Sequence, residues 1–93
     1  MDIRIEDVPE RSQYELTVDG KPGGLVTYRL RPGVIVLVHT EVEDAYEGHG
    51  LGGRLARAVL DDARARGLQV RIVCPFIAEF VEQHPEYADL ADA

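Results

Sequence analysis

The sequence has a single cysteine, no tryptophan and far fewer basic than acidic residues. Because Cys74 is alone, no intrachain disulfide can form, which fits a reducing compartment. Ten Lys and Arg against 17 Asp and Glu give a formal net charge of −7. Such a surface repels nucleic-acid phosphate and attracts basic acceptors, such as an amine or a lysine-rich protein. No apolar run approaches membrane-spanning length, and residues 1–10 lack the regions of a signal peptide, so we expect a cytoplasmic protein.

The length and composition predict one domain, residues 1–93, with a single core, since the chain has 93 residues and is 45% hydrophobic. Alternation of apolar residues and turn signals predict four strands at first. These are DIRIE (2–6), SQYELTV (12–18), GLVTYRL (24–30) and VIVLVHTEV (34–42). DGKPGG (19–24) and RPG (31–33) are turns by composition. The unbroken apolar run of the fourth strand indicates a central position, buried on both faces.

The period then changes to that of helices. Apolar residues at helical spacing predict a helix that ends near Gly67: Leu51, Leu55, Ala58, Val59 and Ala63. LQVRIVC (68–74) is the next strand, and Pro75 opens a second helix that ends at His84–Pro85. Its expected inner face is Phe76, Ile77, Phe80 and Val81. The tail ADLADA (88–93) is expected to fray.

The loop YEGHGLGGRL (46–55) places four glycines in six positions between a strand and a helix. A nucleoside-triphosphate loop would end in Gly-Lys-Ser/Thr, and this one ends in Gly-Gly-Arg. A dinucleotide fingerprint would need a parallel unit and an acidic residue about 20 positions on. Two interpretations remain. Backbone amides and the helix N-terminus could hold a diphosphate, or the loop is a tight turn without a ligand. The number of glycines favours the diphosphate.

This loop resembles the acetyl-coenzyme A signature of the GNAT acetyltransferase superfamily, Arg/Gln-x-x-Gly-x-Gly/Ala, with Glu47 in place of Arg/Gln. A carboxylate repels a diphosphate, so Glu47 is expected to point away. The chain is also similar to the small YjdJ-type N-acetyltransferase-like branch, which carries HTEV before the loop and CPF…HPEY after the next strand. Residues 39–42, 74–76 and 84–87 match these motifs. The resemblance covers nearly the whole chain.

The resemblance implies roles for individual residues. The main chain of Thr40 and Val42 would pair with the pantetheine arm of the acetyl-coenzyme A cosubstrate, and the Val42 N–H would polarise the thioester carbonyl. The diphosphate would be held by backbone amides of Gly48, His49, Gly50, Gly52 and Gly53. Arg54 is the first candidate for the 3′-phosphate and Arg57 the second, although exposed helical arginines are commonly solvated.

Three side chains are candidate catalytic residues. Cys74 ends a strand and precedes a helix N-terminus, where the helix dipole makes a thiol more reactive. It could carry the acetyl group or protonate the departing thiolate, and the structural alternative is a small buried hydrophobe. His39 and Glu41 share one face of their strand, so either could deprotonate an acceptor amine. Their structural alternatives are a core histidine and a surface carboxylate. No metal-ligand spacing is present, so no metal is expected.

The expected fold is α/β (α+β), a minimal GNAT-like fold. It has a twisted, mostly antiparallel sheet, splayed final strands and two helices. The segment DIRIEDVPERSQYEL (2–16) leaves no room for the two N-terminal helices of a full GNAT domain. We therefore expect an open acceptor side that suits a protein or peptide segment. The function implied is an acetyl-coenzyme A-dependent N-acetyltransferase. The alternatives are a non-catalytic coenzyme A-binding module and an interaction domain without the ligand.

Overall fold

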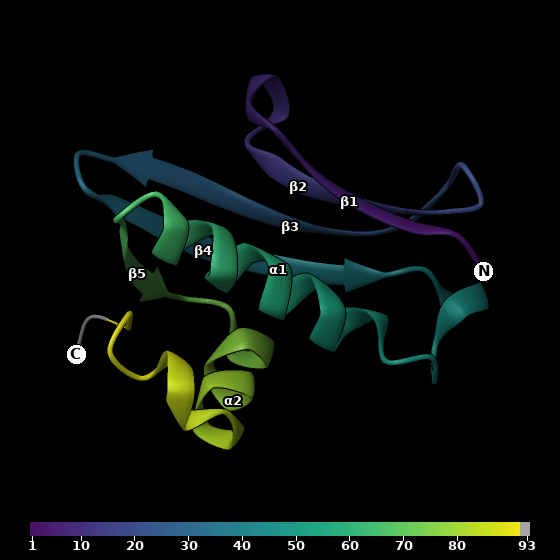
Figure 1. The fold of residues 1–93 in the computed structure, drawn as a ribbon. Coiled ribbons are helices and arrows are strands. Elements are labelled where there is room, and N and C mark those ends of the chain that lie inside the picture. Colours follow the sequence, from purple (N-terminus) through teal and green to yellow (C-terminus); the bar gives the residue numbers. More distant parts are fainter. Residues whose placement is uncertain (92–93) are drawn as a thin grey trace.

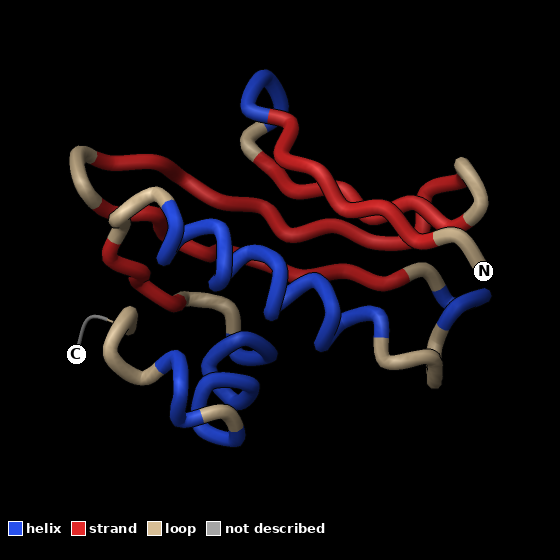
Figure 2. Tube along the Cα trace, viewed as in Figure 1, coloured by secondary structure: helices blue, strands red, loops and turns tan. Residues whose placement is uncertain are grey.

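Five strands form one sheet in the order β1-β2-β3-β4-β5 in the computed structural model, which describes residues 1–91 (Figures 1 and 2). The strands are β1 (Ile3–Val8), β2 (Gln13–Val18), β3 (Lys21–Arg31), β4 (Val34–Val42) and β5 (Gln69–Ile72). The first four pair antiparallel with their neighbours, and β5 pairs parallel with β4. This confirms the expected α+β fold with a mostly antiparallel sheet. Only a short 3₁₀ turn, Pro9–Arg11, joins β1 to β2, so no helices intervene there.

The turn between β2 and β3 is shorter than its composition predicts. Asp19 and Gly20 have φ of +50° and +83°, the left-handed pair of a two-residue hairpin. Residues 21–24 belong to β3, where the register shift opposite Leu16 and Thr17 makes Gly23 an extra residue. A Cβ at Gly24 would lie 2.7 Å from the Glu41 carbonyl oxygen. These glycines therefore serve a bulge and a close strand approach, and the prediction of a six-residue turn was wrong.

The strand β4 is internal in the sheet, but only one of its faces is buried. Ile35 and Leu37 are fully buried, whereas Val34, Val36 and Val38 are only partly covered. The buried residues of the sheet and of both helices join one hydrophobic cluster, so the helices pack on the same face. We call this the inner face, and the other, which neither helix covers, the outer face. The expectation that β4 is buried on both faces was therefore wrong.

The helix α1 (Leu51–Ala65) crosses the inner face of the sheet (Figure 1). The helical spacing is confirmed, and of the five expected residues only Ala58 is not fully buried. The buried residues are Leu51, Leu55, Ala56, Val59, Leu60 and Ala63. Gly67 ends it with φ of +70°, and the Leu68 N–H donates to the Ala63 carbonyl at 2.9 Å. Neither described helix is both long and apolar enough to cross a membrane.

The helix α2 (Pro75–Gln83) begins with proline and buries Ile77 and Phe80 against α1 and the sheet. Phe76 departs from the expected inner face, since it is 44% exposed. Its ring lies instead beside Gly52 at the start of α1. The physical reason is that Gly52 has no side chain and so leaves room there for the ring.

The C-terminal segment is packed as far as residue 91, so the expected fraying is wrong for residues 88–91. Leu90 is buried, and its carbonyl accepts a 2.9 Å hydrogen bond from the Val70 N–H. Arg64 holds Asp89 with two hydrogen bonds of 2.9 Å. The rest of the predicted tail, residues 92–93, lies outside the described residues.

Candidate functional site

The gap between β4 and β5 is the first component of the site. The two strands pair only from Val34–Gln69 to Leu37–Ile72. Beyond this point the Leu37 carbonyl accepts hydrogen bonds from the N–H groups of Val73 (2.9 Å) and Cys74 (3.1 Å), and the chains separate. The splay expected of the last two strands is therefore present. It leaves the β5-facing main chain of residues 38–42 without a strand partner among residues 1–91.

A bulge in β4 decides which side chains face the two sides of this gap. Thr27 pairs with His39 and Tyr28 with Leu37, so Val38 is an extra residue on β4. Beyond the bulge the parity reverses. Thr40 therefore faces inward, because residues paired directly across an antiparallel ladder share a face and its partner is the buried Val26.

Thr40 and Cys74 meet on the inner side of the gap. The Thr40 Oγ1 lies 3.3 Å from the Cys74 Sγ, within hydrogen-bonding distance for sulfur. Cys74 is 3% exposed and precedes α2 without capping it through its side chain. The sequence singled out both positions, but only the main chain of Thr40. No local signal predicts their contact, since 34 residues separate them in the chain.

His39 and Glu41 lie together on the outer face. Their Nε2 and Oε2 atoms are 3.4 Å apart, and their side chains are 59% and 62% exposed. This confirms the shared face that the strand period predicts and contradicts the alternative of a core histidine. The three candidate catalytic residues thus lie on opposite sides of β4: Cys74 is buried beside Thr40, and His39 and Glu41 are open to solvent.

The glycine loop follows the 3₁₀ turn Asp44–Tyr46 and ends where α1 begins. Gly48 and Gly50 have φ of +85° and +72°, and a Cβ at either would meet no atom within 4 Å, so conformation rather than space requires glycine there. Gly52 is different, because a Cβ would lie 2.8 Å from the Phe76 Cζ. The glycines therefore serve two purposes: Gly48 and Gly50 allow left-handed backbone conformations, and Gly52 makes room for the Phe76 ring.

The N-terminus of α1 is uncovered. Gly50 is its N-cap residue and offers no side-chain cap, and the first turn holds no acidic residue. The first N–H groups of a helix have no intrahelical partner and attract anions. An α1 of 15 residues supplies a full helix dipole behind them. This arrangement fits the diphosphate of coenzyme A.

A hollow of about 230 Å³ joins β4 to this N-terminus. It is lined by Val42, Tyr46, Glu47, Gly48, Gly50, Leu51, Gly52, Gly53 and Phe76. Sequence reasoning placed Val42 and the glycines here but missed Phe76 and Tyr46, whose aromatic character was the available signal. Glu47 also lines the hollow, and the direction of its carboxylate stays a prediction.

The two candidate arginines of α1 differ in their surroundings. Arg57 donates to the Tyr87 Oη at 3.1 Å, lies over the rings of Phe80 and Tyr87 at 5.7 and 5.6 Å, and is 3.7 Å from the Glu86 carboxylate. Tyr87 packs there as expected, and burial, with a hydrogen bond to Asp61, raises its pKa. Arg54 is exposed, and no described side chain pairs with it. Of the two, Arg54 is the one available to a ligand phosphate.

Within residues 1–91, no three His, Cys, Asp or Glu side chains are grouped so that they could hold a metal ion. The polar groups of the candidate site are therefore backbone amides, one thiol, one hydroxyl, an imidazole–carboxylate pair and one arginine. Such a set can bind an anionic ligand and move a proton.

The splayed strands, the bulge and the bare helix N-terminus are features of the expected GNAT-like fold. The family described as GCN5-related N-acetyl-transferase matches residues 13–90, and the chain belongs to this family. Proteins of this family generally use acetyl-coenzyme A and act on amine acceptors.

Individual relatives agree with this assignment. The chain is 34% identical to Protein NATD1 of Bos taurus over 85 residues, which cover 89% of this chain and 75% of that protein. The solution structure of a GCN5-like putative N-acetyltransferase from Staphylococcus aureus superposes with a TM-score of 0.74 at 25% identity, over 97% of this chain and 88% of that one. The ribosomal-protein-S18-alanine N-acetyltransferase of Escherichia coli shares the fold, with a TM-score of 0.60 and 24% identity over 62% of this chain and 38% of its own.

Proposed function

We propose that this protein is an acetyl-coenzyme A-dependent N-acetyltransferase of the YjdJ-type branch that modifies an amine of a protein or peptide. The observation that carries the proposal is the alignment of three features along one path. The gap beside β4 extends to Val42, and Val42 lines one hollow together with the first residues of α1.

Acetyl-coenzyme A supplies an activated acetyl thioester. In our proposal the unpaired main chain of Thr40 and Val42 binds the amides of its pantetheine arm as an added strand would. The amides of the glycine loop and of the first turn of α1 bind the diphosphate, and Arg54 meets the 3′-phosphate. The fit is supported by the left-handed φ of Gly48 and Gly50 and by the open space beside both residues, where a Cβ would meet no atom within 4 Å.

The acceptor amine approaches from the outer face, where His39 and Glu41 are exposed. Either residue takes the proton that the amine loses as it bonds to the acetyl carbon, directly or through water. Cys74 lies on the other side of β4, where it protonates the departing thiolate, and the Thr40 hydroxyl holds its sulfur in place. The low exposure of Cys74 supports this role over that of an acetyl carrier.

The test of binding is a titration of the full-length chain with coenzyme A, followed through the backbone amide resonances of residues 48–53. We expect these resonances to shift at micromolar ligand. No movement at millimolar ligand would contradict the proposal.

The test of catalysis is incubation with acetyl-coenzyme A and free-amine peptides, followed by mass spectrometry. We expect an acetyl mass gain on the peptide and none retained on Cys74. The variant Glu41→Gln should lower kcat and leave the coenzyme A affinity unchanged. Tight binding without any transfer would identify a non-catalytic coenzyme A-binding module instead.

A further inference from the structure

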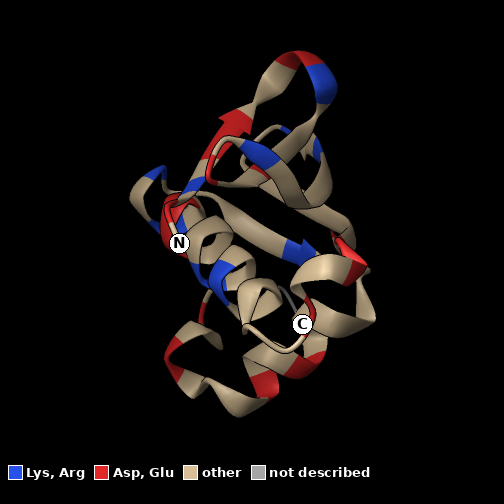
Figure 3. Ribbon diagram, turned by 90° about the vertical axis from the view of Figure 1, so that its right-hand side faces the viewer, with Lys and Arg blue, Asp and Glu red and all other residues tan. Residues whose placement is uncertain are grey.

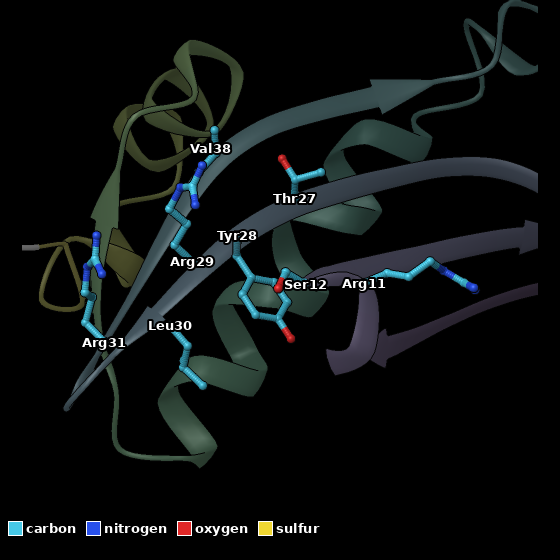
Figure 4. Close-up of a pocket in the computed structure, with 8 residues that line it drawn as sticks. All are labelled: Arg11, Ser12, Thr27, Tyr28, Arg29, Leu30, Arg31 and Val38. Carbon is cyan, nitrogen blue, oxygen red and sulfur yellow. The ribbon is translucent and has the colours of Figure 1, made fainter.

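The outer face carries a group of arginines that the proposed donor site does not use. Arg29 and Arg31 alternate along β3, opposite Val36 and Val34 of β4. On the other side of β4, Arg71 of β5 pairs with the same Val36. Figure 4 shows Thr27, Arg29 and Arg31 on one side of β3, and Tyr28 and Leu30 on the other. We call Arg29 and Arg31 the arginine face.

These charges are unusual in so acidic a chain. Carboxylates form ion pairs with five other arginines: Arg4, Arg11, Arg57, Arg64 and Arg66. Within residues 1–91, no ion pair or side-chain hydrogen bond engages Arg29 or Arg31. Two like charges on one strand face repel each other, so an anionic partner would stabilise both.

Two carboxylates on this face have partners of their own. Glu15 is held by Arg11 at 2.8 Å and by Gln13 at 2.6 Å, and Glu41 faces His39. They therefore leave Arg29 and Arg31 available to a partner from outside the chain.

A hollow of about 410 Å³ lies beside these arginines, larger than the one at the glycine loop. It is lined by Arg11, Ser12, Thr27, Tyr28, Arg29, Leu30, Arg31 and Val38 (Figure 4). Val38 is the bulged residue of β4, and Thr27 pairs with His39. The hollow thus begins beside the candidate base and continues to the arginine face.

We propose that the arginine face binds the carboxylates of an acidic segment in the acceptor polypeptide, so that the segment's amine lies near His39. This inference rests on the proposed function and names its acceptor class. It differs from the expectation of a basic acceptor, because Arg29 and Arg31 place positive charge farther along β3 from Thr27, although the net charge is −7. Distance along a strand sets the spacing: Arg29 and Arg31 lie two and four residues beyond Thr27, about 7 and 14 Å at 3.4 Å per residue. Carboxylates at the third and fifth positions of an extended acceptor match these distances.

The experiment uses three eight-residue peptides with a free N-terminal amine. One has Glu at positions three and five, one has Gln there and one has Lys. Each is titrated into the full-length chain while amide resonances are followed, and each is then offered as acceptor with acetyl-coenzyme A. We expect the Glu peptide alone to shift the resonances of Arg29, Arg31 and Val36, and its kcat/KM to exceed that of the Gln peptide by about tenfold.

Two matched double variants distinguish an effect of the arginine face from an effect of the overall charge. Arg29→Gln/Arg31→Gln should abolish the preference for the Glu peptide, whereas Arg4→Gln/Lys21→Gln removes the same charge elsewhere and should retain it. Equal use of the three peptides, or a preference for Lys, would overturn the inference. The inference would also be overturned if the Glu peptide left these resonances unchanged while anionic lipid vesicles, or a higher protein concentration, shifted them.

The binding step also separates the two proposals. If coenzyme A shifts residues 48–53 and the Glu peptide shifts nothing, the inference fails and the proposed function stands. If the peptide binds and coenzyme A does not, the proposed function fails, and with it the assignment of the arginine face to an acceptor.

Discussion

Gly53 is the third residue of α1, and a Cβ there would lie 3.7 Å from the Phe80 Cε2, an ordinary van der Waals distance. The position can therefore accept a side chain without moving its neighbours. We predict that Gly53→Ala raises the free energy of unfolding by about 0.5–1 kcal/mol, because alanine loses less conformational entropy in a helix. Thermal unfolding measures this gain. Coenzyme A affinity should stay within about twofold of the parent.

The variant Gly53→Glu should separate folding from ligand binding. A carboxylate in the first turn of a helix interacts favourably with the dipole, so the folded state remains at least as stable as in the parent. The same charge repels a diphosphate, so the Kd for coenzyme A should rise by about tenfold or more. Calorimetric titration of both variants makes the comparison. Equal affinities in the alanine and glutamate variants would show that the first turn of α1 does not bind the diphosphate.

At the scale of elements, the contact between α1 and α2 depends on Gly52, whose absent side chain makes room for the Phe76 ring. We predict that Gly52→Ala destabilises the parent protein, because a Cβ at 2.8 Å from the Phe76 Cζ forces the ring to move. In a Phe76→Ala background the same substitution should be stabilising, by about 0.5–1 kcal/mol, since only helix propensity remains. Urea unfolding of the four proteins in this double-mutant cycle measures the difference. Equal effects of Gly52→Ala in both backgrounds would refute the contact.

Elements with a clear period were predictable from the sequence, and arrangements that depend on distant contacts were not. In β2 apolar residues alternate with polar ones, and in α1 they recur at helical spacing, so each pattern directly indicates which face is buried. The apolar run of β4 gave the wrong result because a run of valines fits a covered or an uncovered face equally well. Whether the outer face of β4 is buried depends on whether other elements of the chain pack against it.

The candidate site divides in the same way. The glycine loop was predictable because its composition is local. The contact of Thr40 with Cys74, the position of Phe76 beside Gly52, and the reversal of parity at Val38 join residues distant in sequence or depend on strand register. No single-sequence pattern encodes them.

At the scale of the whole molecule, two buried tyrosines join separate elements, Tyr28 of β3 to β1 and Tyr14 of β2 to α1. The Tyr28 Oη donates to Asp7 at 2.6 Å, and the Tyr14 Oη donates to Asp62. Arg66 lies 3.5 Å from the Asp7 carboxylate and 3.4 Å from that of Asp62. Burial, with the hydrogen bond to Asp7, raises the pKa of Tyr28 to about 12, and burial with Asp62 raises that of Tyr14 as well.

These shifts predict a loss of stability in alkali. An unfolded tyrosine releases its proton near pH 10, whereas folded Tyr28 keeps its own until about pH 12. Between these values the unfolded chain binds fewer protons, so the free energy of unfolding falls as pH rises. We predict that the stability difference between the parent and Tyr28→Phe is largest below pH 10 and shrinks toward pH 12. Urea unfolding from pH 8 to 11 measures it, and a constant difference would contradict the assignment.

Charge is also unevenly distributed over the molecule. Residues 75–91 contain Glu79, Glu82, Glu86 and Asp89 but no Lys or Arg, and the lowest helix in Figure 3 shows this. The net charge is thus a poor guide to the field at any one face.

The extra residue at Val38 has a consequence for how this strand can change over time. Deleting Val38 would restore a regular ladder and exchange the sides to which every later side chain of β4 points. The hydroxyl beside Cys74 and the imidazole open to solvent would then trade places. Substitutions can alter the side chains of this strand one at a time. A one-residue deletion at the bulge would instead change the side chains on both faces of β4 at once.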